Sequence, residues 1–198
     1  MLNETPALAP DGQPYRLLTL RNDAGMVVTL MDWGATLLSA RIPLTDGSVR
    51  EALLGCASPE YYQDQAAFLG ASIGRYANRI ANSRYTWAGE TVSLLPSQGE
   101  NQLHGGPDGF DKRRWQIVNQ NDRQVLFALT SDDGDQGFPG HLYQTVYSRT
   151  HAKTPLSTLL SCSGANEGWA TYVEMYAYGL SDTDPNLAEL YRLNRSLT

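Results

Sequence analysis

The sequence predicts a mainly β protein, in which an antiparallel β-sandwich over residues 1–137 is followed by an α-helical C-terminal tail over residues 138–198. Between Tyr15 and about Ser131, short apolar or alternating runs are separated by turns that contain Gly, Asp or Asn. This pattern is typical of all-β sandwiches. After about Tyr143, apolar residues instead recur with the period of an α-helix. The change of pattern predicts two domains.

Three strands are expected first, because three apolar or alternating runs are bounded by turn-forming residues. They are Arg16–Leu20, Met26–Met31 and Leu37–Ile42. The segment Thr45–Ser48 then predicts a turn, in which Gly47 takes a positive φ.

Two hairpins are expected after these strands. In each, two strand-like runs flank a short polar or glycine-containing segment, which is the signal for a tight connection. The four runs are Arg84–Trp87, Thr91–Leu94, Trp115–Val118 and Val125–Leu129.

Two amphipathic helices are expected in the tail, over residues 167–179 and 185–197. Asp184 suits the N-cap of the second helix, and Pro185 suits its first position. The apolar face of the first helix is formed by Trp169, Tyr172, Val173, Tyr176 and Leu180, and that of the second includes Leu187, Leu190, Tyr191 and Leu197.

The composition is that of an ordinary globular protein, with 41% hydrophobic and 18% charged residues among 198. A net charge of -6 argues against nucleic acid as a partner, since the phosphate backbone is bound by clustered Lys and Arg. The only basic run, Lys112–Arg114, is interpreted as a solvated patch.

The sequence shows no signal for secretion or for a membrane partner. Residues 1–14 have neither a basic start nor an apolar stretch, and no run approaches the ~20 apolar residues of a membrane span. Cys56 and Cys162 occur in unrelated contexts, so they predict neither a disulfide framework nor a Cys-based zinc site. A cytoplasmic location is therefore expected.

Two short motifs carry the candidate site. Residues 74–80 read Gly-Arg-Tyr-Ala-Asn-Arg-Ile, and residues 101–106 read Asn-Gln-Leu-His-Gly-Gly. Arg79 beside Asn78 supplies hydrogen-bond donors and acceptors in a fixed arrangement, as sugar binding requires. His104 titrates near neutral pH and can donate to a sugar oxygen.

A structural interpretation of each residue alone stays open. His104 then caps a turn, and Arg79 pairs with a surface carboxylate. The glycines that follow, Gly105 and Gly106, lack side chains, which favours close approach of a ligand to the backbone.

The two motifs, with Arg79 and His104 separated by 25 positions (104 minus 79), resemble the sugar-binding front half of the galactose mutarotase, or aldose 1-epimerase, family. The resemblance covers most of residues 1–137. It implies a galactose mutarotase-like β-sandwich and an isomerase of carbohydrate metabolism. The implied substrate is an aldose such as galactose or glucose, and no cofactor is needed. Asn78 and Arg79 match the family's substrate-contacting pair, and His104 matches the first of its two active-site histidines.

Mutarotation requires a base for the C1 hydroxyl and an acid for the ring oxygen. In the family, the second histidine and the catalytic glutamate lie further along a longer chain. Here His151 is the only histidine beyond residue 150 and its surroundings do not match, while Glu167 and Glu174 follow a different pattern. The resemblance therefore predicts a truncated enzyme that is inactive or nearly so.

The tail resembles a helical family of zinc-peptidase-like proteins of unknown function. Pro139-Gly140-His141 keeps the second histidine of that family's metal motif, and Glu167 keeps its late carboxylate. Asp135 and Gln136 stand where the leading His-Glu pair belongs, so one ligand and the general base are missing. His141 and Glu167 are expected to be a metal-free remnant, and no metal is predicted.

Two acidic groups have simpler interpretations than their spacing first indicates. The run Asp132–Asp135 lacks the full ligand set of a calcium loop, and a turn between strands is expected. Glu167 and Glu174 are about two helical turns apart, roughly 10 Å, and are expected on a solvated edge.

Three hypotheses for the function stay open. The first is a truncated aldose 1-epimerase-like protein. The second is a weak carbohydrate-binding or purely structural β module, and the third is a fragment of a metal-dependent hydrolase. Residues Gly137–Gly140 resemble both families, so a chimeric chain joined at this shared sequence is expected.

Overall fold

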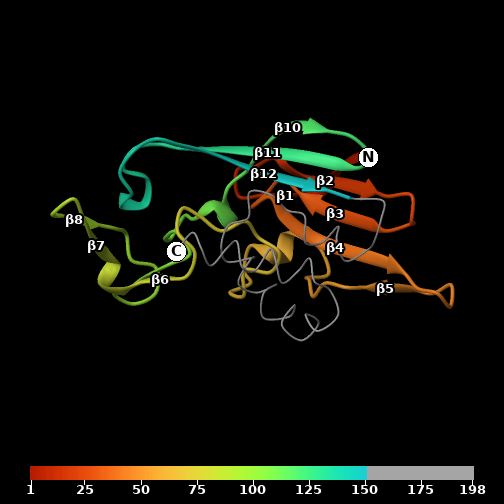
Figure 1. Cartoon of the computed structure of the whole chain (residues 1–198), viewed down its shortest axis with the longest axis horizontal. Coiled ribbons are helices and arrows are strands. Elements are labelled where there is room, and N and C mark those ends of the chain that lie inside the picture. The colour runs from red at the N-terminus through yellow and green to blue at the C-terminus, as the bar shows by residue number, and fades with distance from the viewer. Residues whose placement is uncertain (151–198) are drawn as a thin grey trace, which may run out of the picture.

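The computed structural model describes residues 1–150, which form antiparallel β-sheets connected by turns and short 3-10 helices (Figure 1). The predicted mainly β architecture is confirmed for this part of the chain. The helices predicted over residues 167–179 and 185–197 lie outside the described residues, as does Cys162. Within residues 1–150, no helix has the length and apolar character that a membrane span requires.

The first sheet has five strands that follow one another in chain order, β1-β2-β3-β4-β5. Strands β2, β3 and β4 are the three strands predicted first. Their residues alternate between the two faces of the sheet, as a period of two requires. The bounds are β1 Leu2–Leu8, β2 Pro14–Arg21, β3 Val27–Met31, β4 Thr36–Pro43 and β5 Val49–Glu51.

The sequence did not predict strand β1. Its residues are mostly exposed, it contains Pro6, and its pairing with β2 shifts register between Glu4 and Leu8. An exposed edge strand needs no apolar alternation and tolerates proline, so it leaves no periodic signal in the sequence.

The second sheet has three strands, in the order β10-β11-β12. The predicted hairpin over residues 115–129 is confirmed as β10, Gln116–Gln120, and β11, Gln124–Ser131. Strand β12, Leu142–Arg149, pairs with β11 along its whole length.

Strand β12 shows that the helical pattern expected from about Tyr143 is wrong for residues 143–149. Val146 and Ser148 are buried, whereas Tyr143 is 60% exposed. Alternate residues of this segment therefore face the interior, and the eight pairs with β11 satisfy the backbone. The alternation is short and mostly polar, so it is a weak signal in the sequence.

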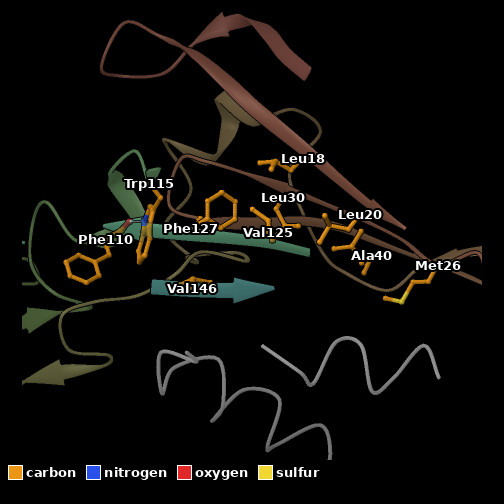
Figure 2. Close-up of a cluster of buried hydrophobic side chains, with 12 residues drawn as sticks. Leu18, Leu20, Met26, Leu30, Ala40, Phe110, Trp115, Val125, Phe127 and Val146 are labelled. Carbon is orange, nitrogen blue, oxygen red and sulfur yellow. Dashed lines mark hydrogen bonds between the residues drawn. The ribbon is translucent and has the colours of Figure 1, made fainter. Parts of the chain in front are cut away.

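The two sheets bury their facing sides in one hydrophobic core (Figure 2). Leu18, Leu20 and Leu30 come from the first sheet, and Val125 and Phe127 come from the second. The indole of Trp115 closes the core near the start of β10, where its Nε1 donates to the carbonyl oxygen of Phe110 at 3.0 Å. Burial of these side chains provides most of the stabilisation that joins the sheets.

A second cluster covers the other side of the five-stranded sheet. It contains Ala9, Tyr15, Met31, Trp33 and Tyr62, the last from the 3-10 helix η1, Pro59–Tyr62. Arg114 lies beside Trp33 and donates to the fully buried carboxylate of Asp32. Arg114 therefore ties the segment before β10 to the end of β3.

A small two-stranded ladder outside the two larger sheets positions the candidate site. Strand β6, Arg79–Ile80, pairs with β9, Gln102–Leu103. The predicted hairpin between them is confirmed as β7, Arg84–Trp87, and β8, Glu90–Ser93 (Figure 1). The remaining 3-10 helices are η2 Ala81–Ser83, η3 Phe110–Lys112 and η4 Asp135–Gly137.

Candidate functional site

The β6–β9 ladder brings the two sequence motifs together. Arg79 is directly opposite Leu103, so Asn78 and His104 lie just beyond the paired residues, at the same end of the ladder. The backbone pairing therefore places Asn78, Arg79 and His104 close together.

Asn78 and His104 are joined by two hydrogen bonds. The backbone N–H of Asn78 donates to Nδ1 of His104 at 3.0 Å, and the backbone N–H of His104 donates to the carbonyl oxygen of Asn78 at 3.1 Å. Both residues have positive φ angles, 67° and 52°, in the left-handed region that Asn and His adopt more readily than most residues. His104 therefore stabilises a turn, as the structural interpretation expected, and its ring is held in one orientation.

The side chain of Arg79 is positioned by two amide oxygens. Its Nε donates to Oε1 of Gln98 at 2.6 Å, and its Nη1 lies 3.5 Å from Oδ1 of Asn78. The same Asn78 oxygen accepts the backbone N–H of Arg79 at 2.9 Å. These partners are neutral amides, so the alternative in which Arg79 pairs with a surface carboxylate does not describe this structure. The sequence did not predict Gln98 as part of the site.

The glycines after His104 allow close packing of the protein on itself. A Cβ on Gly105 would overlap the carbonyl oxygen of Gly74, and a Cβ on Gly106 would lie 2.7 Å from Oε1 of Gln136. Both glycines have positive φ angles, 90° and 106°. The space that the missing side chains leave is therefore filled by the 74–80 turn and by η4, not by an open approach for a ligand.

The loop between β11 and β12 is hydrogen-bonded to the segments that carry the candidate site. Arg75 donates from Nε to Oγ of Ser131 at 2.8 Å and from Nη1 to the carbonyl oxygen of Pro139 at 3.1 Å. Nε2 of Gln102 donates to the carbonyl oxygen of Gln136 at 3.3 Å. The acidic run at residues 132–135 is therefore part of a turn between strands, as predicted, and this turn is bonded to both site motifs.

Asp135 serves as the ionic anchor of that loop. Its carboxylate accepts two hydrogen bonds from the guanidinium of Arg113, each 2.6 Å long. Burial alone would raise the pKa of Asp135, but the hydrogen bonds from Arg113 and Ser131 lower it to about 2. Asp135 stays charged and fully engaged, so it is not available as a metal ligand.

Phe68 contacts the imidazole of His104 from the loop between η1 and β6. The ring centroids are 4.6 Å apart, and the ring planes are inclined by 61°. Phe68 is half-buried and has a φ of 54°. No motif in the sequence pointed to this residue, because its contact with His104 depends on the conformation of a loop.

The electrostatic environment keeps His104 neutral. Burial lowers the pKa of its imidazole, and the positive charge of Arg79 lowers it further. Because Nδ1 accepts the Asn78 N–H, the proton of the neutral ring is on Nε2. The free edge of His104 is therefore a hydrogen-bond donor.

Asp111 is a second titratable group close to the His104 turn. Its Oδ1 is buried and has no hydrogen-bond partner among residues 1–150, and burial raises the pKa of the carboxyl to about 6. A Cβ on Gly109 would lie 2.6 Å from this oxygen and 2.7 Å from the carbonyl oxygen of His104. The sequence did not predict the position of Asp111.

The remnant metal motif is only partly within the described residues. His141 is exposed, and its Nδ1 lies 3.3 Å from Oδ1 of Asp132. In residues 1–150, no three His, Cys, Asp or Glu side chains are grouped as a metal site would require. Glu167, the other weak metal candidate, lies outside the described residues, as do His151 and Glu174.

The converging groups suit a neutral polyhydroxy ligand. Arg79 offers guanidinium N–H groups, Asn78 a carboxamide, and His104 a neutral imidazole N–H. All three are uncharged or positive, and two of them are exposed. They can donate to several hydroxyl or ring oxygens at once, which is how sugars are recognised.

Comparison with known proteins identifies relatives of the whole described region. The family model "Aldose 1-epimerase" matches residues 16–157. An aldose 1-epimerase from Escherichia coli (strain K12) is 90% identical over 149 residues, which are 75% of this chain and 43% of that protein. An aldose 1-epimerase from Haemophilus influenzae is 54% identical over 146 residues, which are 74% of this chain and 42% of that protein.

Solved structures agree with the sequence comparison. An aldose epimerase homologue from C. elegans superposes with a TM-score of 0.65 at 31% identity, over 69% of this chain and 42% of that chain. A galactose 1-epimerase from Lactobacillus acidophilus superposes with a TM-score of 0.62 at 30% identity, over 74% and 43% of the two chains. The chain thus spans about two fifths of the length of the relatives it matches.

Proposed function

Because the chain belongs to the aldose 1-epimerase family, we propose that residues 1–150 form the front part of an aldose-binding site of this isomerase family. The ligand is the pyranose form of an aldose such as galactose or glucose. One observation carries the proposal: two hydrogen bonds join Asn78 to His104, and they place Arg79, Asn78 and the free edge of His104 at the same end of the ladder.

Each residue has a distinct role in the proposed site. Arg79 donates from its guanidinium to sugar hydroxyls, since Gln98 and Asn78 leave it only partly occupied. Asn78 orients Arg79 through Oδ1 and contacts the sugar with its carboxamide. His104 donates from Nε2 to a sugar oxygen and stabilises negative charge that develops there.

The chemistry of mutarotation requires two proton transfers, and the proposed site supplies a group for one of them. A base removes the proton from the C1 hydroxyl while an acid protonates the ring oxygen, and the ring opens to the aldehyde. Rotation about the C1–C2 bond and the reverse transfers give the other anomer. His104 is held as a donor and can serve one of these transfers. In residues 1–150 the only other histidine is His141, which pairs with Asp132 on an exposed turn.

We therefore expect sugar binding without appreciable acceleration of mutarotation. A positioned acid or base typically contributes ~10²–10⁴-fold, so a chain that offers one member of the pair loses most of the rate enhancement.

The chimeric nature of the chain and its division near residue 138 stay predictions, and so does the cytoplasmic location.

Binding is tested by titrating ¹⁵N-labelled protein with galactose and glucose and following backbone amide shifts. We expect saturable shifts at Asn78, Arg79 and His104. Arg79→Ala should abolish them, whereas Arg50→Ala, a change at an exposed arginine of β5, should leave them intact. If the shifts in the native chain do not saturate, the proposed site is wrong.

Catalysis is tested separately by polarimetry of fresh α-D-galactose and α-D-glucose. We expect the rate with the native chain to equal that with His104→Ala, which also controls for host enzyme in the preparation. A native rate well above this control would show that the chain holds a complete acid–base pair, with His151, Glu167 and Glu174 as the first residues to replace.

A further inference from the structure

The imidazole of His104 is held from two directions. On one edge, Nδ1 accepts the backbone N–H of Asn78 at 3.0 Å. From another direction, the ring of Phe68 packs against it in an edge-to-face arrangement, with centroids 4.6 Å apart. Aromatic pairs prefer this geometry, which fixes the relative orientation of the rings as well as excluding water. The hydrogen bond alone would leave the imidazole free to tilt about the N–H direction.

The backbone of Phe68 is strained, and this strain indicates a demand on its side chain. A φ of 54° is unusual for a bulky residue and is energetically unfavourable. Such a conformation persists only where the surroundings impose it. If Phe68 merely filled space, a relaxed backbone with the same apolar side chain would serve as well.

The loop around Phe68 is firmly anchored. Oε1 of Gln65 accepts the backbone N–H groups of Ala67 and Leu69, at 2.9 and 3.3 Å. Further along, the backbone N–H of Leu37 in β4 donates to the carbonyl oxygen of Gly70 at 2.8 Å. The Gln65 bonds fix the shape of the loop and the Leu37 bond connects it to the five-stranded sheet, so the backbone of Phe68 is held by contacts outside the site.

We propose that Phe68 is a positioning residue, which holds the His104 imidazole in one orientation with its proton on Nε2 and its donor edge free. The functional role of this His104 orientation rests on the proposed sugar site, in which Nε2 donates to a sugar oxygen. Phe68 itself need not touch the sugar. It acts by excluding water from the imidazole and by preventing the ring from turning away from the Asn78 N–H.

The groups around the imidazole explain why the aromatic ring matters for protonation. Arg79 on β6 is the charged group whose field acts on His104, while Phe68 and Asn78 are uncharged. Burial is the larger cause of the lowered pKa of His104, and Arg79 is the smaller. Removal of the Phe68 ring admits water to the imidazole and weakens the larger cause, so the charged form becomes more accessible.

The test uses ¹⁵N-labelled protein, whose histidine ring nitrogens report tautomer and protonation directly. The variants are Phe68→Leu, Phe68→Gly and Phe68→Tyr, with Tyr61→Leu as a matched control at an exposed aromatic residue of η1. His104→Gln assigns the resonance, since the chain has three histidines. Phe68→Gly is included because glycine adopts a φ of 54° without strain, so this variant loses the ring while the loop keeps its conformation.

In the native chain and in Phe68→Tyr we expect the Nε2–H tautomer and a His104 pKa below the ordinary value of about 6.5. In Phe68→Leu and Phe68→Gly we expect that pKa to rise toward the ordinary value, together with a mixture of tautomers. The Tyr61→Leu control should behave as the native chain does. Folding of each variant is checked by the amide spectrum of the core strands.

An unchanged tautomer and pKa in folded Phe68→Gly would overturn the proposal, even if Phe68→Leu failed to fold. No sugar is present in this measurement, so its outcome is independent of the sugar titration. A failed titration with the expected tautomer change would leave Phe68 as a positioning residue and remove the sugar site. A saturable titration with no tautomer change would support the sugar site and overturn the positioning role of Phe68.

Discussion

At the scale of single residues, the candidate site contains two titratable groups that burial shifts toward their neutral forms. The pKa of His104 is lowered and that of Asp111 is raised, in both cases chiefly because water is excluded. A Cβ on Gly109 would lie within 3 Å of both Oδ1 of Asp111 and the carbonyl oxygen of His104, so the two residues are neighbours. The positive charge of Arg79 lies beside the neutral imidazole, so the site offers both charged and neutral hydrogen-bond donors to a ligand.

The first prediction concerns Asp111. Its pKa of about 6 in the folded chain exceeds the unfolded value of about 3.9, so the folded state binds more protons between these two values. The free energy of unfolding should therefore fall as the pH rises from about 4 to about 6, and then stay level. Asp111→Asn removes this pH-dependent loss. The free energy of unfolding of the variant should therefore equal that of the native chain near pH 4 and exceed it at pH 7 by up to about 3 kcal/mol.

Urea unfolding at half-unit pH intervals from 4 to 8 measures this difference. Asp23→Asn, at an exposed carboxylate, is the control and should show no comparable pH-dependent gain. A stability difference between Asp111→Asn and the native chain that is constant over the whole range would contradict the prediction.

The second prediction concerns Gly105. In Gly105→Ala the new methyl group would overlap the carbonyl oxygen of Gly74, at a φ of 90° that alanine rarely adopts. We expect the overlap and the unfavourable φ together to lower the free energy of unfolding by roughly 2–5 kcal/mol. Gly12→Ala has a similar φ of 77° but nothing within 4 Å, so it should lose only about 1–2 kcal/mol. Equal losses in urea unfolding would show that the close approach to Gly74 carries no cost.

Residue motifs predicted part of the site and missed the rest for a physical reason. Asn78, Arg79 and His104 belong to two short motifs whose order and spacing resemble those of a known family. Phe68 and Gln98 contact these residues only because separate loops fold back onto them. No local pattern encodes such contacts, so they require the three-dimensional structure.

At the scale of elements, strand β12 is the main departure from the sequence-based expectation. Apolar or alternating runs marked β2, β3 and β11, whose side chains contribute to the core. In β12 the inward positions include Ser148, so polarity does not separate the two faces. The strand is specified mainly by its partner β11, and a reading of the isolated segment cannot detect that.

The third prediction tests β12 directly. Val146 is buried in the shared core, opposite Phe127 in the β11 ladder, whereas Tyr143 on the same strand is 60% exposed. Val146→Ala should lower the free energy of unfolding by roughly 1–3 kcal/mol, because it removes buried methyl groups and leaves a cavity. Tyr143→Ala should change the free energy of unfolding by no more than about 0.5 kcal/mol. Comparable losses for the two variants in urea unfolding would mean that residues 142–149 do not form this strand.

At the scale of the whole molecule, the described region is held together by contacts between parts that are distant in the chain. The carbonyl oxygen of Arg21 at the end of β2 accepts from Oγ1 of Thr150 just after β12, at 3.2 Å. Arg114 connects the β1–β2 turn to the end of β3 through Asp11 and Asp32. The mainly β class followed from local periodicity, but these long-range bonds determine how the sheets meet.

The fourth prediction concerns Arg114. Arg114→Met keeps much of the side-chain volume but leaves the fully buried carboxylate of Asp32 without its ionic partner. Breaking a buried ion pair in this way typically costs ~3–5 kcal/mol. Arg123→Met removes a pair with Asp23 whose side chains are 51% and 65% exposed, and should cost no more than about 1 kcal/mol. Thermal and urea unfolding of the two variants would refute the prediction if the losses were similar.

The position of the β7–β8 hairpin has an evolutionary consequence. The hairpin lies wholly between β6 and β9, and these two strands pair with each other whatever lies between them. Where the hairpin begins and ends, Leu94 N–H donates to the carbonyl oxygen of Ser83 at 2.7 Å, while the tip residue Trp87 is 72% exposed. Lengthening, shortening or replacing the tip therefore leaves Asn78 and His104 in register. The outer surface of the molecule can therefore change at this point without a change in the backbone pairing that positions the two residues.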